Sequence, residues 1–201
     1  MARSFTQLAI NAEKKRTSLA ISKKPIDKPE LQIHTLGNSA LRQNAQRISK
    51  VDSSVRELVK KMLHSMYSAK GIGLAAPQIG IQQQLLVIDL DIEDSTSPPM
   101  VFINPEITDF SASIDTYEEG CLSIPGVYLN VIRPSSIKVN YRDEMGRPKK
   151  LNTDGLLSRC IQHEMDHLNG VLFVDRVTNS QDLKQELKEN GFNEKDVLAI
   201  T

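Results

Sequence analysis

Two histidines four residues apart carry the clearest chemical signal in the chain. They belong to the segment His163-Glu164-Met165-Asp166-His167. On a helix of 3.6 residues per turn, positions i and i+4 project from one face, so both imidazoles can bind one metal ion. Glu164 projects about 100° away around the axis, which suits a base that takes a proton from water better than a third ligand. Two core histidines bonded to backbone carbonyls are the alternative.

A buried helix is expected to carry this pair. Asp154 can cap its first turn, and Gly170 suits the position after its last turn. Histidines and acids in such a helix need partners, because an unpaired polar group in the interior costs roughly 1–3 kcal/mol and a charge costs more. A metal ion would supply them. Apolar residues lie on most sides of the helix, namely Leu156, Leu157, Cys160, Ile161, Met165 and Leu168.

The third metal ligand has several candidates. One class of zinc protease places a histidine six residues after the second one, but Phe173 stands there and cannot bind metal. Another class uses a glutamate from a following helix, such as Glu186 or Glu189, although both lie in a charge-rich segment typical of a solvated surface. Cys121 is the better candidate, because nearby glycines and a proline let a strand end approach the helix. Cys160 is interpreted as a small buried apolar residue.

Three segments together resemble the signature segments of the peptide deformylase family, in the same order. They are Gly71–Gln78 (GIGLAAPQ), Glu119–Ser123 (EGCLS) and Gln162–His167 (QHEMDH). The resemblance spans Leu31 to Val177 and is closest to the type 1B branch, which is cyanobacterial or plastid-like. It implies a metal-dependent hydrolase that removes the N-formyl group from the formylmethionine of newly synthesised polypeptides and releases formate.

The resemblance also implies a metal site and a reaction path. Cys121, His163 and His167 would bind one divalent ion and leave a position open for water. Metal-bound hydroxide would attack the formyl carbon, with Glu164 as the general acid and base that passes the proton to the leaving amine. Imidazole and thiolate suit several metals. The resemblance favours Fe2+, with Zn2+, Ni2+ or Co2+ as substitutes.

Further residues are assigned by the resemblance to the oxyanion and the substrate. The Gln78 side-chain amide and the Leu122 backbone N–H would donate to the oxyanion of the tetrahedral intermediate. Gly73 would let an extended substrate pair with the protein backbone. Binding of the methionine side chain requires an apolar pocket. The residues implied to bind substrate are Ile72, Gly73, Glu119, Gly120, Tyr128, Arg133 and Cys160.

Two arginines lie at the expected pocket. Arg133 and Glu119 would form an ion pair on its wall. Arg159 departs from the family pattern, in which an aliphatic residue is common at this position, so the resemblance does not define the pocket rim there.

The remaining pattern predicts an α+β fold with antiparallel β-sheets packed around the metal-binding helix. Apolar spacing predicts a helix over 52–69 with a capping box of Ser54 and Glu57, and a short helix is expected over 179–190. Short runs separated by turns favour antiparallel pairing over a wound parallel sheet. The expected strands span residues 85–90, 100–107, 127–133, 137–142 and 149–152.

Length and charge divide the chain into a flexible basic arm, residues 1–30, and a single catalytic domain, residues 31–201, with a short C-terminal helix. A chain of 201 residues suits one sizeable core. Residues 1–30 contain seven Lys or Arg and three acids, a net charge of +4 in a chain of net charge zero. A short helix over 7–16 and a cleaved transit peptide are alternatives for this arm.

The sequence limits the cellular compartments and the partners that are expected for this protein. Two cysteines, no apolar export signal and no segment of membrane-spanning length favour a reducing interior such as cytosol or stroma. The resemblance implies the cytoplasm of a cyanobacterial-like bacterium, with the plastid stroma as the alternative. The expected partners are N-formylmethionyl nascent peptides and, transiently, the ribosome, but neither DNA nor a membrane. Because residues 182–196 contain five acids and three lysines, any ribosome contact is expected to be weak or to use another surface.

Two other functions stay open from the residues alone. The first is an endopeptidase that uses the same helix with a glutamate ligand. The second is a non-catalytic module that binds peptides or the ribosome and holds a structural metal with four protein ligands.

Overall fold

A five-stranded antiparallel sheet carries much of the core. The computed structural model describes residues 21–200. Its apolar strands are hydrogen-bonded neighbours, and the apolar face of helix α2 (Ser53–Ser68) packs against β1 and β2. In spatial order the strands are β1 (Gly73–Ala75), β2 (Leu85–Ile88), β3 (Met100–Phe110), β6 (Ser136–Arg142) and β7 (Pro148–Asp154).

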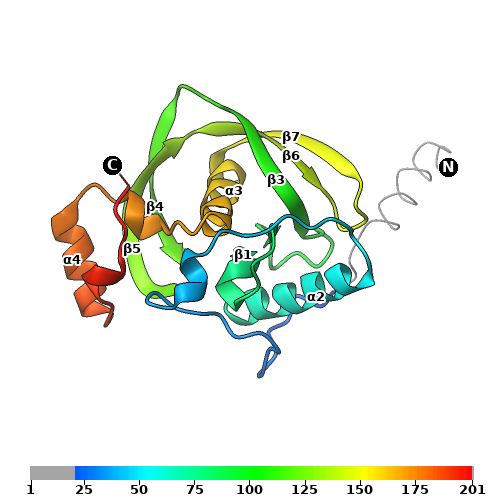
Figure 1. Cartoon of the computed structure of the whole chain (residues 1–201), viewed down its shortest axis with the longest axis horizontal. Coiled ribbons are helices and arrows are strands. Elements are labelled where there is room, and N and C mark those ends of the chain that lie inside the picture. The colour runs from blue at the N-terminus through cyan, green and yellow to red at the C-terminus, as the bar shows by residue number, and fades with distance from the viewer. Residues whose placement is uncertain (1–20, 201) are drawn as a thin grey trace, which may run out of the picture.

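A separate hairpin faces the central helix. It consists of β4 (Ile114–Cys121) and β5 (Ile124–Pro134). α3 (Gly155–Leu168) lies at the centre of the molecule, with the sheet on one side and this hairpin on the other (Figure 1). α4 (Ser180–Glu189) packs against β5. The 3-10 turns are η1 (Ser39–Arg42), η2 (Ala76–Ile79), η3 (Phe173–Arg176) and η4 (Glu194–Asp196).

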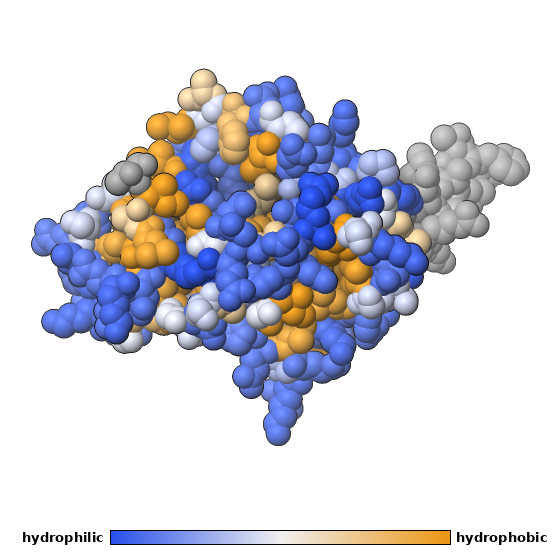
Figure 2. Space-filling view, viewed as in Figure 1, coloured by the Kyte–Doolittle hydropathy of each residue, from blue (hydrophilic) through white to orange (hydrophobic). Residues whose placement is uncertain are grey.

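Part of the hairpin surface is apolar. Figure 2 shows hydrophobic residues gathered at the upper left of the molecule, over the β4–β5 hairpin and the C-terminal segment. Large hydrophobic side chains are exposed in both segments because little of the chain covers them. They are Ile114, Tyr117, Tyr128, Ile132, Leu198 and Ile200.

The predicted α+β class is confirmed, but the sequence prediction does not include two of the strands, β1 and β4. The expected runs become β2, β3, β5, β6 and β7 with shifted ends. β1 is only three residues long. In β4 the one fully buried residue is Glu119, so the strand lacks the apolar alternation that a sequence search detects. Pairing with β5 holds β4 in place.

Two helix starts differ from the expected caps. Asp52, rather than a box of Ser54 and Glu57, caps α2, because Asp52 Oδ1 accepts from backbone N–H groups of the first turn. Asp154 does occupy the N-cap position of α3, but its side chain makes no capping hydrogen bond. Asp154 is still paired with Ser136 in the sheet, so β7 runs directly into the helix.

Residues 21–30 pack against the domain. Lys23 Nζ lies 2.6 Å from Asp89 Oδ2 in a nearly buried ion pair, and the Tyr67 hydroxyl donates to the same carboxylate. Residues 1–20, with the alternative of a short helix over 7–16, lie outside the described residues, and the domain boundary at residue 30 stays a prediction. No helix in the described part of the chain is long and apolar enough to cross a membrane.

Candidate metal centre

The β4–β5 hairpin brings Cys121 to α3. β4 ends at Cys121, Leu122 and Ser123 form a two-residue turn, and β5 begins at Ile124 opposite Cys121. The backbone N–H of Ser123 donates to Cys121 Sγ over 3.4 Å. The thiol is therefore positioned by a strand end and its turn.

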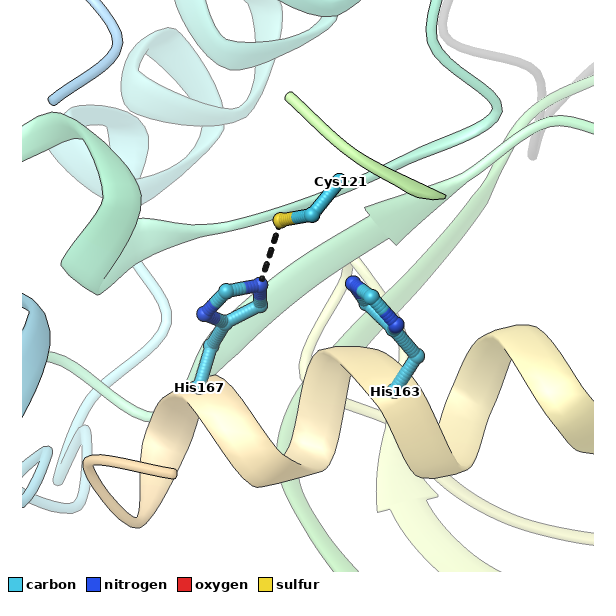
Figure 3. Close-up of side chains that lie close together, drawn as sticks. All are labelled: Cys121, His163 and His167. Carbon is cyan, nitrogen blue, oxygen red and sulfur yellow. Dashed lines mark hydrogen bonds between the residues drawn. The ribbon is translucent and has the colours of Figure 1, made fainter. Parts of the chain in front are cut away.

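One turn of α3 separates the two histidines, and both imidazoles point toward Cys121 (Figure 3). Cys121 Sγ and His167 Nε2 are 3.3 Å apart. One ligand atom each from Cys121, His163 and His167 lies within 4.8 Å of the others. A thiolate and two imidazoles this close together fit a single divalent ion that prefers nitrogen and sulfur ligands, as Zn2+ and Fe2+ do.

The alternative ligands lie elsewhere. Glu186 and Glu189 are on α4, which packs on β5, and neither belongs to the group of potential ligands found among residues 21–200. Glu189 instead accepts a hydrogen bond from the Gln185 side chain. The glutamate-ligand alternative therefore has no geometric support.

The buried carboxylate of Glu119 orients His163. Its Oε2 lies 2.9 Å from His163 Nδ1, and a proton held on Nδ1 leaves Nε2 free to bind a metal. The Arg133 guanidinium donates to both carboxylate oxygens, over 2.6 and 2.9 Å. Burial alone would raise the pKa of Glu119, but Arg133 and His163 hold it well below its usual range. The expected ion pair between Glu119 and Arg133 is therefore present.

Three further residues extend this network. Arg133 also donates to Asp166, which receives two hydrogen bonds from Arg176. Arg159 donates to Glu119 Oε1 over 3.0 Å. Asp166 and Arg176 have no role in the sequence prediction. One feature of the sequence could have indicated Asp166: it is an acid on a helix expected to be buried. A buried charge of this kind needs a cationic partner.

The two histidines respond differently to their surroundings. Burial lowers the pKa of both. For His163, the nearby Cys121 and the hydrogen bond to Glu119 outweigh burial and raise the pKa well above its usual value. For His167, burial and the nearby charge of His163 hold the pKa well below it. A metal ligand must be a neutral imidazole, so metal binding would displace a proton from His163.

Glu164 is buried on the pocket side of α3 and forms no ion pair with another described residue. It is 4 % exposed, and its Oε2 has no hydrogen-bond partner among the described residues. Burial raises its pKa to about 7. A Cβ at Gly73 would collide with Glu164 Oε1 and Cys160 Sγ, so only glycine lets β1 pass this close.

Gln78 is held with its amide nitrogen toward the cysteine. The backbone N–H of Ala75 donates to Gln78 Oε1 over 2.8 Å. Gln78 Nε2 donates to Ser123 Oγ over 3.1 Å and lies 3.5 Å from Cys121 Sγ. Ser123 is fully buried and has no place in the sequence-based assignment, although it lies in the cysteine-containing segment.

A pocket of about 560 Å³ opens beside the metal ligands. It is mainly apolar, and Cys121, His163 and Glu164 are among the residues that line it. Arg133 does not line it, contrary to its expected place among the substrate-binding residues, because its guanidinium is turned toward Glu119 and Asp166 behind the wall. The other expected residues do line it, together with Gln78, Leu122 and Arg159: they are Ile72, Gly73, Glu119, Gly120, Tyr128 and Cys160.

This combination of fold and site defines a metal-binding hydrolase. An antiparallel α+β domain presents a Cys from a hairpin to an HExxH helix, beside a pocket. The family model described as polypeptide deformylase matches residues 30–183. The chain therefore belongs to the polypeptide deformylase family.

Individual relatives agree with this assignment. A peptide deformylase of Prochlorococcus marinus strain SARG is 80 % identical over 200 residues, covering 100 % of this chain and 98 % of the relative. The crystal structure of a Synechococcus elongatus peptide deformylase in complex with actinonin is 53 % identical, with a TM-score of 0.90 over 92 % of this chain and 100 % of that one. A plant peptide deformylase, PDF1B, is 38 % identical, with a TM-score of 0.76 over 82 % and 89 % of the two chains. The type 1B resemblance thus extends to solved structures.

Proposed function

We propose a mechanism for the deformylase activity of this chain, in which Glu164 moves the proton and Cys121, His163 and His167 hold the metal. The activity removes the N-formyl group from nascent peptides. The observation that carries the proposal is the close approach of three metal-binding side chains beside a buried acid that has one oxygen without a hydrogen-bond partner. The unpaired Glu164 oxygen is the group able to exchange a proton in this part of the pocket.

Glu164 would act as general base and then as general acid. A divalent ion held by Cys121, His163 and His167 would supply Lewis acidity, which polarises a carbonyl group and acidifies water. Glu164 accepts a proton from the attacking water and passes it to the nitrogen of the leaving amine. In the metal-free protein burial raises the pKa of Glu164 to about 7, and a proton carrier works best with a pKa near the working pH.

Two donors would stabilise the oxyanion. Gln78 Nε2 is directed toward Cys121 because Ala75 holds the opposite end of the amide. The Leu122 backbone N–H lies in the turn directly after Cys121. One such preorganised donor is worth roughly 3–4 kcal/mol of barrier. The mainly apolar pocket would take the methionine side chain, while Gly73 at the start of β1 offers its backbone to the substrate.

Fe2+ is the proposed metal, with Zn2+, Ni2+ or Co2+ as substitutes. The donor set accommodates all four. A thiolate-bound ferrous site is open to oxidation, so we expect protein purified in air to lose activity or to carry zinc. Iron protein prepared without oxygen is expected to release formate faster than the zinc form at equal metal content. Equal or slower release would overturn the iron assignment.

A formate-release assay with formyl-Met peptides, combined with metal analysis, tests the site. Cys121→Ala is expected to lose the bound metal and formate release together. Cys160→Ala is the matched control, because Cys160 lies in the pocket wall outside the group of ligands, and it is expected to retain the metal. Retention of metal by Cys121→Ala would refute the thiolate ligand.

We further propose the bacterial cytoplasm as the compartment and formylmethionyl nascent peptides at the ribosome as the setting. The cyanobacterial origin of the relatives supports a bacterial cytoplasm rather than a plastid stroma. Residues 1–30 are proposed to be a basic arm on a catalytic domain of residues 31–201, with residues 21–30 packed against that domain. Cell fractionation with activity measured in each fraction tests the compartment.

A further inference from the structure

Arg159 connects the two elements between which the metal ligands are divided. It lies on α3, one turn before His163, and is 8 % exposed. Its Nη1 donates to Glu119 Oε1 and to the Val131 carbonyl, each over 3.0 Å, and its Nη2 donates to the Asp115 carbonyl over 2.7 Å. One guanidinium therefore bonds β4 and β5 to the helix.

The position of the hairpin on α3 decides whether a metal site exists. Cys121 comes from β4, whereas His163 and His167 come from α3, and His163 is oriented by Glu119, two residues before Cys121. A small shift of β4 along α3 would move the thiol and the orienting carboxylate together. β4 has few apolar side chains with which to resist such a shift, since Glu119 is its one fully buried residue.

We propose that Arg159 is a positioning residue, which holds the hairpin on α3 and keeps the Glu119 carboxylate against His163. A planar guanidinium suits this role because its fixed fork reaches two carbonyls and a carboxylate at once. The Tyr117 ring covers the group, with its centroid 6.0 Å from the guanidinium carbon. Arg133 also joins the hairpin to α3, through Asp166, but the Asp115 and Val131 carbonyls receive their side-chain hydrogen bonds from Arg159.

Co2+ binding to the full-length protein provides the test. Affinity is measured by chelator competition, and the Co2+–thiolate absorption reports the ligand geometry. Arg159→Leu is expected to weaken Co2+ affinity about 10- to 100-fold and to change the spectrum, as removal of groups that orient metal ligands does. Arg159→Lys keeps the charge and can reach one acceptor at a time, so an intermediate loss is expected. Arg147→Leu is the matched control, because Arg147 pairs with Asp143 outside the pocket.

A role in substrate contact predicts a different result. If Arg159 only contacted substrate, Arg159→Leu would raise KM and leave Co2+ affinity and spectrum unchanged, and this outcome overturns the proposal. Should the leucine variant fail to fold, Arg159→Lys decides: affinity and spectrum equal to those of the unmodified protein overturn the proposal, and a loss supports it. A cycle with Glu119→Gln adds a second criterion, since coupling through Glu119 requires non-additive losses.

This inference rests on the metal site of the proposed function. Failure of the unmodified protein to bind Co2+ through Cys121 would refute the site itself. Normal binding by both the unmodified protein and the Arg159 variants would refute only the positioning role.

Discussion

Two buried carboxylates on either side of His163 have opposite surroundings. Glu119, on the β4–β5 hairpin, is bonded to Arg133, Arg159 and His163, and its pKa lies well below the usual range. Glu164, on the pocket side of α3, has one oxygen without a partner, and burial raises its pKa to about 7. Both are about equally buried, at 5 and 4 % exposure.

The difference separates positioning from proton transfer. A carboxylate that stays ionised and fully bonded can hold an imidazole in one orientation, but it has no lone pair or proton to exchange. A buried carboxylate that lacks an ion-pair partner binds a proton near neutral pH and can exchange it. Opposite pairing thus makes an orienting group of one glutamate and a proton carrier of the other.

The largest expected effect follows from removing the proton carrier. Glu164→Gln is expected to lower kcat for formyl-Met peptides by about 10²- to 10⁴-fold, because the amide cannot accept and return the proton. Metal content should stay at that of the unmodified protein, since Glu164 is outside the ligand group. Glu57→Gln on the surface of α2 is the control and should be fully active. A Glu164→Gln variant with normal turnover would remove the distinction between the two glutamates.

Removing the orienting charge is expected to affect stability and metal binding together. Glu119→Gln leaves Arg159 without a counter-ion and Arg133 with Asp166 alone, and breaking a buried pair in this way costs about 3–5 kcal/mol of unfolding free energy. Metal affinity should fall about 10- to 100-fold. Chemical denaturation and chelator competition measure the two effects.

An exposed ion pair serves as the reference for Glu119. Asp109→Asn breaks the surface pair with Lys138 and is expected to change the free energy of unfolding by less than about 1 kcal/mol. If Glu119→Gln were as mild as this control, the network around His163 would not be the stabilising feature described above.

The pH dependence of the metal-free protein gives a third test. The Glu164 pKa of about 7 exceeds the usual 4.5, so between these values the folded protein keeps a proton that the unfolded chain has lost. This group therefore makes the metal-free protein less stable as pH rises through that window, by roughly 1.4 kcal/mol per pH unit. Urea unfolding should show Glu164→Gln gaining stability relative to the unmodified protein from pH 5 to pH 7. A difference independent of pH would contradict the raised pKa.

The smallest effect is expected at the outer end of the network. Arg176 is half-buried and donates two hydrogen bonds to Asp166, which keeps Arg133 as a buried partner. Arg176→Lys retains the charge but loses the fork, so a cost of about 1 kcal/mol and less than a twofold change in metal affinity are expected. Thermal unfolding and Co2+ titration check both values. A loss as large as that of Glu119→Gln would mean that the whole network acts as one unit.

The parts of the site that depend on local sequence patterns could be predicted from the sequence. The pair of His163 and His167 follows from helical periodicity, and the glycine- and proline-bracketed Cys121 follows from backbone freedom at a strand end. The sequence prediction misplaced Arg133 in the pocket lining, because the direction of a long side chain depends on what lies behind the strand. It also missed β4, whose polar residues are held by pairing with β5 rather than by an apolar face of their own.

The sequence by itself therefore determined the chemical inventory: two imidazoles on one helix face, a thiol, an acid between the histidines and the family to which the chain belongs. Only the tertiary structure decided which acid is paired and which is not. The physical reason is that helix periodicity is a local property of a few residues, whereas the partners of Glu119 come from β5 and α3, brought together by packing. Burial and pairing, which set the different pKa values of Glu119 and Glu164, exist only after those elements meet.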